Sequence, residues 1–161
     1  MNKNVAKKTH KLKNISIKEN GVRLDINMRR FENNLNNAQY LLDKAVMTSM
    51  MPLMPKDDGV FIDDTVAKSD SVAGTGIVYA AFGDQGRYLY EGKTMVDEKT
   101  GSPWARKGAR KVLVSQYGGK TNAKENLTYS RAEARPQWFE AAKERDLDQW
   151  LKIAKGEMGK E

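Results

Sequence analysis

The hydrophobic period of the chain changes once, near residue 28, and this change limits what the first fifty residues can form. Residues 14–28, NISIKENGVRLDINM, alternate apolar and polar side chains on both sides of Asn20-Gly21. Such alternation around Asn-Gly is the strongest short-range signal for a β-hairpin with a two-residue turn. The sequence therefore predicts two antiparallel strands whose apolar residues share one face: Ile15, Ile17, Val22, Leu24 and Ile26.

Beyond this hairpin, residues 28–50, MRRFENNLNNAQYLLDKAVMTSM, repeat their apolar side chains every three or four positions. This spacing predicts one long amphipathic helix. Asn27 is a candidate N-cap, and Pro52 and Pro55 are expected to end the helix because proline lacks the backbone N–H. A methionine cluster at 47–54 is interpreted as adaptable packing, with a promiscuous binding surface as the less favoured alternative.

The middle of the chain has no sustained period. Short apolar runs at 60–62, 71–73 and 75–83 predict extended segments, and residues 83–92, GDQGRYLYEG, predict a short helix or turn. Residues 94–111, TMVDEKTGSPWARKGARK, are typical of a long loop, since polar residues with Gly and Pro give no core-facing pattern. Two further strand candidates follow, VLVSQYGG and NLTYS.

The C-terminal run, residues 135–156, RPQWFEAAKERDLDQWLKIAKG, holds two Trp and one Phe in a helix-forming context. Pro136 suits the first turn of a helix, and Gly156 suits its end. Because Trp138, Phe139 and Trp150 belong to an apolar stripe of helical period, we expect them to be structural and to brace the sheet. A base-stacking or ligand role is the less favoured alternative.

Charge is unevenly distributed along a chain whose net charge is +7. Lysines crowd the first thirteen residues, acidic residues gather between Asp57 and Asp70, and a second basic segment spans 106–124. Basic clusters of this kind attract nucleic acid or an acidic protein surface, and a solvated tail and loop is an equally weighted alternative. We expect residues 1–12 to be a disordered basic tail and residues 13–161 to form a single domain.

The sequence disfavours catalysis. His10 is the only histidine and cysteine is absent, so neither a Ser-His-Asp triad nor a zinc site of His and Cys is available. The acidic pairs 57–58 and 63–64 lack EF-hand spacing, and no glycine pattern matches a dinucleotide- or phosphate-binding loop. We therefore predict no enzymatic activity, no cofactor and no metal. A membrane partner is not expected, since no apolar run approaches roughly 18 to 20 residues.

The order of the segments carries a resemblance that no single segment carries. The hairpin precedes a helix ending in MPLMPKDDG, the stretch GIVYAAFGDQGRYLYEGK, a variable loop and a closing ARPQWFEAAKERDLDQWLKIAKG. Between about residues 28 and 156 this order resembles the minor capsid proteins of tailed phages of Gram-positive hosts, which belong with tail-completion and head–tail joining proteins. The matching positions are Pro55 and Gly59 in the loop, Tyr79, Tyr88, Tyr90 and Gly92 in the middle, and Pro136, Trp138, Phe139, Ala142 and Trp150 at the end; Asp58 stands where that family typically has Thr.

This resemblance implies a structural virion protein of the phage neck, assembled in the host cytoplasm. It would form a homo-oligomeric ring that joins head connector to tail. The implied fold is α+β, with a small antiparallel sheet packed by the long helix and the C-terminal helix. The implied partners are other copies of the chain, head-connector and tail proteins, and, non-specifically, passing DNA. The acidic middle and the basic loop are complementary patches of the kind that a head-to-tail ring contact requires.

The long loop, residues 93–124, is the segment that we expect to reach outside its own domain, because loops of this length are usually functional or disordered. Its candidate partner-binding residues are Trp104, Arg106, Lys107, Arg110 and Lys111. The alternative function is that of a basic nucleic-acid-binding protein, since Trp104 and Tyr117 lie among basic residues. The loop has no helix-turn-helix or RNP-like signature that would strengthen this alternative.

Overall fold

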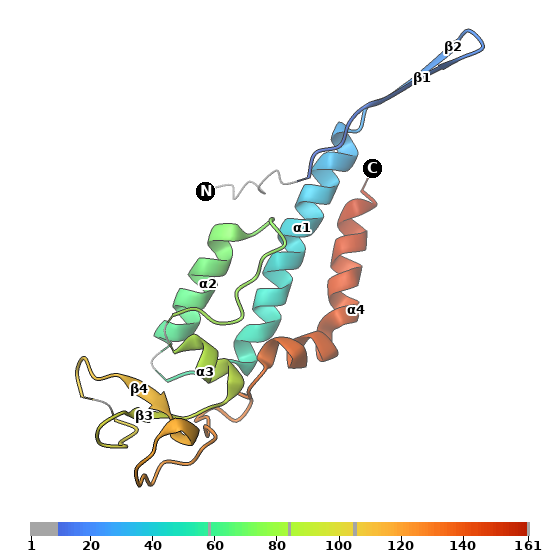
Figure 1. The fold of residues 1–161 in the computed structure, drawn as a ribbon. Coiled ribbons are helices and arrows are strands. Elements are labelled where there is room, and N and C mark those ends of the chain that lie inside the picture. The colour runs from blue at the N-terminus through green and yellow to red at the C-terminus, as the bar shows by residue number, and fades with distance from the viewer. Residues whose placement is uncertain (1–9, 58, 84, 105, 161) are drawn as a thin grey trace.

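The computed structural model describes residues 10–57, 59–83, 85–104 and 106–160. The fold is α+β, as predicted, with α1 lying between α2 and α4 in Figure 1. A β-hairpin extends from one end of α1, and a small β lobe lies at the other end (Figure 1). In chain order the elements are β1 (Ile15–Glu19), β2 (Val22–Ile26), α1 (Arg29–Met50), the 3-10 turn η1 (Met51–Leu53), α2 (Val60–Val72), α3 (Gly86–Glu91), β3 (Met95–Asp97), β4 (Lys111–Leu113), the 3-10 turn η2 (Val114–Gln116) and α4 (Trp138–Met158).

Helix α1 confirms the period read from residues 28–50. The side-chain oxygen of Asn27 accepts the backbone N–H of Arg29 at 2.9 Å, so it satisfies one of the free donors at the start of the helix. At the other end the chain turns through η1 at Pro52. The helix buries a polar position as well as apolar ones: the carboxylate of Asp43 accepts the backbone N–H groups of Gly74 and Gly76 and so fixes the chain after α2.

Helix α4 packs antiparallel against α1. Near one end the side-chain amide of Asn34 donates to the carbonyl oxygen of Lys160 at 2.7 Å. Near the other end the indole N–H of Trp150 donates to the hydroxyl of Ser49 at 3.0 Å. The two long helices predicted from the sequence therefore form the main packing interface of the fold.

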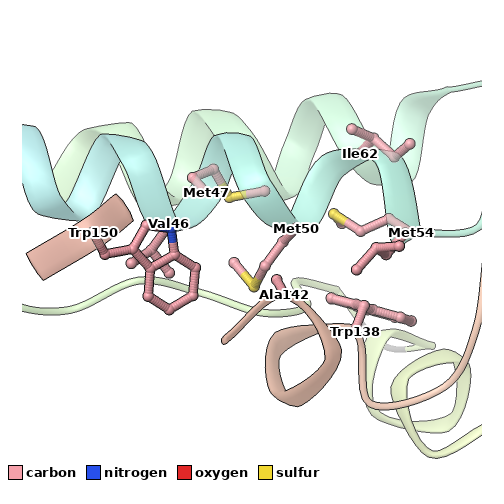
Figure 2. Close-up of a cluster of buried hydrophobic side chains, with 9 residues drawn as sticks. Val46, Met47, Met50, Met54, Ile62, Trp138, Ala142 and Trp150 are labelled. Carbon is pink, nitrogen blue, oxygen red and sulfur yellow. The ribbon is translucent and has the colours of Figure 1, made fainter. Parts of the chain in front are cut away.

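Trp138 is the centre of the hydrophobic core, and Figure 2 shows it beside Met54 and Ala142. Its side chain is fully buried, and its indole N–H donates to the carbonyl oxygen of Ala80 at 2.7 Å. The rings of Phe61 and Tyr90 meet it edge-on, with centroids 6.0 and 4.8 Å away. The expected burial is confirmed, but its partners are helices and the segment 74–82 rather than a sheet, because both sheets here are ribbons of only two strands.

Helix α2 corrects the prediction of extended segments at 60–62 and 71–73. Two of its buried positions carry hydroxyls rather than hydrocarbon, Thr65 and Ser69. Each hydroxyl bonds the chain beyond the helix: Thr65 Oγ1 accepts the N–H of Phe82 at 3.2 Å, and Ser69 Oγ accepts the N–H of Tyr79 at 3.0 Å. The segment 75–83, also predicted to be extended, is thus held along α2 without being a strand.

The antiparallel pairing is divided between two separate two-stranded sheets, β1–β2 and β3–β4. The second sheet corrects the prediction of a structureless loop, since both of its strands fall within residues 93–124. The strand predicted at 126–130 is reduced to a single bridge between Lys93 and Asn126. The short helix or turn predicted at 83–92 is α3, which ends at Gly92 in a left-handed conformation.

Most of the basic tail expected at residues 1–12 lies outside the described residues. Its last three residues, 10–12, run beside the first turns of α1. Asn36 exchanges two hydrogen bonds with the backbone of His10, and the N–H of Leu12 donates to the carboxylate of Glu32 at 3.1 Å. These bonds fix the chain immediately before the hairpin.

Candidate interaction surfaces

The β1–β2 hairpin, here called the arm, projects from the end of α1 away from the helices (Figure 1). Ile15 lies opposite Ile26 and Ile17 opposite Leu24, and directly opposed residues share a face of the ribbon. Val22 extends this face at the tip, opposite Glu19. The arm therefore presents one apolar face whose exposed fractions reach 51% at Ile17 and 70% at Val22.

The conformation of the arm is set at both of its ends. At the tip, Asn20 and Gly21 both have positive φ, 48° and 83°, as the two central residues of a type I′ turn require. At the base, the side-chain oxygen of Asn14 accepts the backbone N–H of Met28 at 2.9 Å. Because the base is bonded to the first turn of α1, the arm is a defined extension of that helix.

The second candidate surface is the β3–β4 lobe, residues 93–127. Val96 pairs with Val112 and Asp97 with Lys111. Backbone bonds from Thr94 to Glu125 and from Leu127 to Gly92 close the lobe at its root.

A buried carboxylate organises the tip of the lobe. Asp97 has no exposed surface, and its oxygens accept the backbone N–H groups of Lys99 and Thr100 at 2.8 and 3.1 Å. The guanidinium of Arg106 approaches the same carboxylate at 3.0 and 3.1 Å. Arg106, followed by the N–H of Lys99, lowers the pKa of Asp97 well below its usual range, and burial, which acts in the opposite direction, is outweighed.

A glycine contact supports this tip. Gly101 has φ +66°, and the ring of Tyr117 lies against it so closely that an added Cβ would sit 2.5 Å from the ring. The hydroxyl of Thr121 donates to the carbonyl oxygen of Gly101 at 2.6 Å. The segment after η2 therefore packs onto the β3–β4 turn, and only a residue without a side chain fits there.

The structure separates the five candidate partner-binding residues into different environments. Trp104 is 88% exposed, the most exposed of the large apolar side chains. Lys107 and Arg110 are also exposed, and Arg110 lies 3.9 Å from Glu98. Arg106 is bound to Asp97, and Lys111 is half-buried in β4. The exposed contact group is therefore Trp104, Lys107 and Arg110, whereas Arg106 shapes the lobe that carries it.

The surface around this contact group is mixed in charge. A hollow of about 270 Å³ beside it is lined by Asp97, Glu98 and Lys99 from one side of the turn and by residues 106–110 from the other. Acidic and basic groups alternate along its wall. Such a surface fits a protein partner with charges of both signs better than a uniformly anionic one.

The aromatic residues of α4 belong to the interior. Phe139 stacks on Trp150 with ring centroids 6.3 Å apart and an interplanar angle of 23°. Tyr90 donates its hydroxyl to Glu140 and so ties α3 to the start of α4. Burial, followed by the bond to Glu140, raises the pKa of Tyr90 above its usual value. These residues brace the fold, as the sequence predicted for Trp138, Phe139 and Trp150.

The acidic middle of the chain lies mainly on α2, where Asp63 and Asp64 are exposed and Asp70 pairs with Lys44 at 2.7 Å. Asp58 lies outside the described residues. Within the described part of the chain, no group of three or more potential metal-ligating residues comes together. None of the helices that the structure describes has the length and apolar character needed to cross a membrane.

Comparison with family models, with curated proteins and with solved structures finds no match to this chain. The arm and the contact group on the lobe are therefore interpreted from their own geometry and chemistry. The sequence could have pointed to the exposure of Trp104, which lies between Pro103 and a basic run. No signal in the sequence separates Arg106 from its basic neighbours, because its partner Asp97 lies in a different strand.

Proposed function

We propose that this protein is a structural component of a phage neck, which forms a homo-oligomeric ring and joins the head connector to the tail. It would assemble in the host cytoplasm and remain in the virion. The proposal starts from the resemblance in segment order described above. The structural observation that carries it is the arm, a rigidly based extension with a fully apolar face that is left exposed.

An exposed apolar face of this kind is a feature of surfaces that bind other proteins. The edges of a two-stranded ribbon also leave backbone N–H and C=O groups available for pairing with another strand. An arm that fits a different surface on the next copy makes a heterologous contact, and heterologous contacts close into rings when the rotation allows it. The arm therefore supports assembly through copies of the same chain.

The lobe supplies a second contact at the opposite end of α1 (Figure 1). Its contact group combines an exposed tryptophan with an arginine, two residue types that dominate the energy of protein interfaces. Two separate contact surfaces suit a protein that must bind its own copies and also a different neck component. We assign the lobe to the second of these contacts.

Infection without this gene product tests the proposal directly. Head–tail joining should fail, so DNA-filled heads and separate tails should accumulate and be visible by electron microscopy of the lysate. Supplying the intact gene in trans should restore joined particles. Normal yields of infectious particles after deletion of the gene would refute the neck function.

A second candidate function, non-specific nucleic-acid binding, is favoured by one observation, the exposed Trp104 beside Lys107 and Arg110. An aromatic side chain among cations can stack on a base while the cations contact phosphates. If the lobe binds nucleic acid, affinity for a duplex or single strand should fall steeply with rising salt, and Trp104→Ala should weaken single-strand binding. Salt-independent or undetectable binding would remove this candidate.

A further inference from the structure

Helix α4 carries an apolar stripe on its outer side, distinct from the face that packs on α1. Leu147, Leu151, Ala154 and Met158 follow one another at intervals of four, three and four residues, so they lie on one face of the helix. The three large side chains keep between 40% and 51% of their surface exposed. We call this row the α4 stripe.

The arm and the α4 stripe match in length. Eleven residue steps at 1.5 Å give the stripe a length of about 17 Å. A strand of five residues, the length of β1 and of β2, spans about 17 Å. Both surfaces are built from aliphatic side chains in a single row or ribbon, so one can cover the other along its whole length.

The two surfaces do not meet within one chain. The arm points away beyond the N-terminal end of α1, while α4 lies beside that helix (Figure 1). The base of the arm is bonded to α1 through Asn14 and Asn27, which fixes this direction. A partner for each surface must therefore come from another molecule.

We propose that the arm of one copy docks its apolar face on the α4 stripe of a neighbouring copy. This inference rests on the proposed ring-forming function and assigns the contact that would build the ring. The arm and the stripe are different surfaces, so each copy gives one arm and receives one. That is the heterologous arrangement from which closed rings are made.

Charge supports the same pairing. Basic residues outnumber acidic residues on the arm and its base, whereas acidic residues slightly outnumber basic residues on α4. Attraction between such surfaces favours encounter in one orientation. The residues are Lys11, Lys13, Lys18, Arg23, Arg29 and Arg30 against Glu19 and Asp25 on the arm and its base, and Glu140, Glu144, Asp146, Asp148 and Glu157 against Lys143, Arg145, Lys152 and Lys155 on α4.

The size of the contact explains why a ring, rather than a pair, is the stable form. Exposed apolar patches of this kind cover a few hundred Å², which is less than the roughly 800 Å² per partner of a standard interface. A single arm–stripe contact is therefore weak. Closure of the ring makes the last contact intramolecular and raises the stability of the whole assembly.

Disulfide trapping tests this contact, because the chain has no cysteine of its own. Two single-cysteine proteins, Ile17→Cys on the arm and Leu151→Cys on the stripe, are mixed and oxidised. We expect a covalent dimer that contains one copy of each variant, identified by mass spectrometry. The matched control replaces Ile17→Cys with Lys18→Cys, which lies next in β1 but on the opposite face, and the yield of the mixed dimer should drop at least several-fold.

Native mass spectrometry of the unmodified chain separates the two hypotheses. Oligomers that form without an Ile17–Leu151 cross-link would overturn the arm–stripe contact and leave the ring-forming function standing. A monomer at all concentrations, without the cross-link, would overturn both. Cross-linking of Ile17→Cys only to itself would show arm-to-arm pairing and would also overturn the proposal.

Discussion

Asp97 and Arg106 hold each other across the tip of the β3–β4 lobe, with Arg106 Nε and Nη2 3.0 and 3.1 Å from the two carboxylate oxygens. The carboxylate is buried and the guanidinium is half-exposed. Trp104 lies between these residues in sequence and is presented to solvent by the turn that they close. An ion pair at the base of a turn thus determines where the most exposed large apolar side chain lies.

This pair should make the lobe sensitive to acid. The pKa of Asp97 is depressed in the folded protein, chiefly by Arg106, whereas an unfolded aspartate titrates near about 3.9. A depressed folded pKa contributes stability that is present above the unfolded value and is lost as pH falls below about 4 toward the folded value. Asp97→Asn should therefore lower the melting temperature at neutral pH, and the difference from the wild type should shrink in acid.

Thermal unfolding followed by circular dichroism between about pH 7 and about pH 2.5 measures this effect. Asp25→Asn is the matched control, because Asp25 pairs with Arg23 in an exposed ion pair on the arm, and exposed pairs contribute little. A difference between wild type and Asp97→Asn that stays constant over this range would contradict the assignment.

The two tryptophans, one buried and one exposed, should differ widely in their effect on stability. Trp138→Ala removes the centre of the core and the bond to Ala80, so we expect a loss of about 3–5 kcal/mol in the free energy of unfolding. Trp104→Ala should change this free energy by no more than about 0.5 kcal/mol, as surface substitutions usually do. Urea denaturation of both variants measures the contrast, and equal losses would refute the placement of Trp138 as the core residue.

Two glycines of the lobe offer a similarly matched comparison. Gly101 and Gly108 both have positive φ, so alanine at either position carries the strain of a left-handed conformation, about 1–2 kcal/mol. At Gly101 the new methyl group would also meet the ring of Tyr117 at 2.5 Å, whereas among the described residues nothing lies within 4 Å of a methyl group at Gly108. Gly101→Ala should therefore lower the unfolding midpoint in urea distinctly more than Gly108→Ala, and the reverse order would contradict the packing of Tyr117.

The predictions that succeeded were those that depended on a long, single period or a specific turn. The hairpin around Asn20-Gly21 and the helices α1 and α4 follow from alternation, helical spacing and turn chemistry that act within a few residues of each other. The burial of Trp138 and Trp150 follows from the same spacing. The sequence did not predict that the arm would leave its apolar face exposed, because alternation shows that a face is apolar and not what covers it.

The predictions that failed lacked an apolar signal at the decisive positions. Helix α2 buries hydroxyl side chains at Thr65 and Ser69, which bond to the chain at 79–82, so its helical period is hidden in a hydropathy pattern. The three-residue strands of the lobe are fixed by the bonds of Asp97 rather than by alternation. Such long-range polar contacts become visible only once the chain has been folded.

The functional prediction concerns the exposed cations beside Trp104. Lys107→Glu combined with Arg110→Glu should leave the free energy of unfolding within about 0.5 kcal/mol of the wild type, because both side chains are exposed. Arg106 and Lys111 are left unchanged, since the first holds Asp97 and the second lies opposite it in β4. The double variant should still form rings through its arm but should fail to dock on the next neck component.

When only this double variant is supplied during infection, DNA-filled heads and separate tails should accumulate, as counted by electron microscopy and by the titre of infectious particles. Lys120→Glu combined with Lys124→Glu is the control, because it makes the same change in net charge with exposed residues of the same lobe, away from Trp104 in sequence. Its titre should stay near that of the wild type. If both double variants reduce the titre equally, total charge rather than the contact group controls docking. If the first variant gives normal yields of joined particles, the lobe does not make this contact.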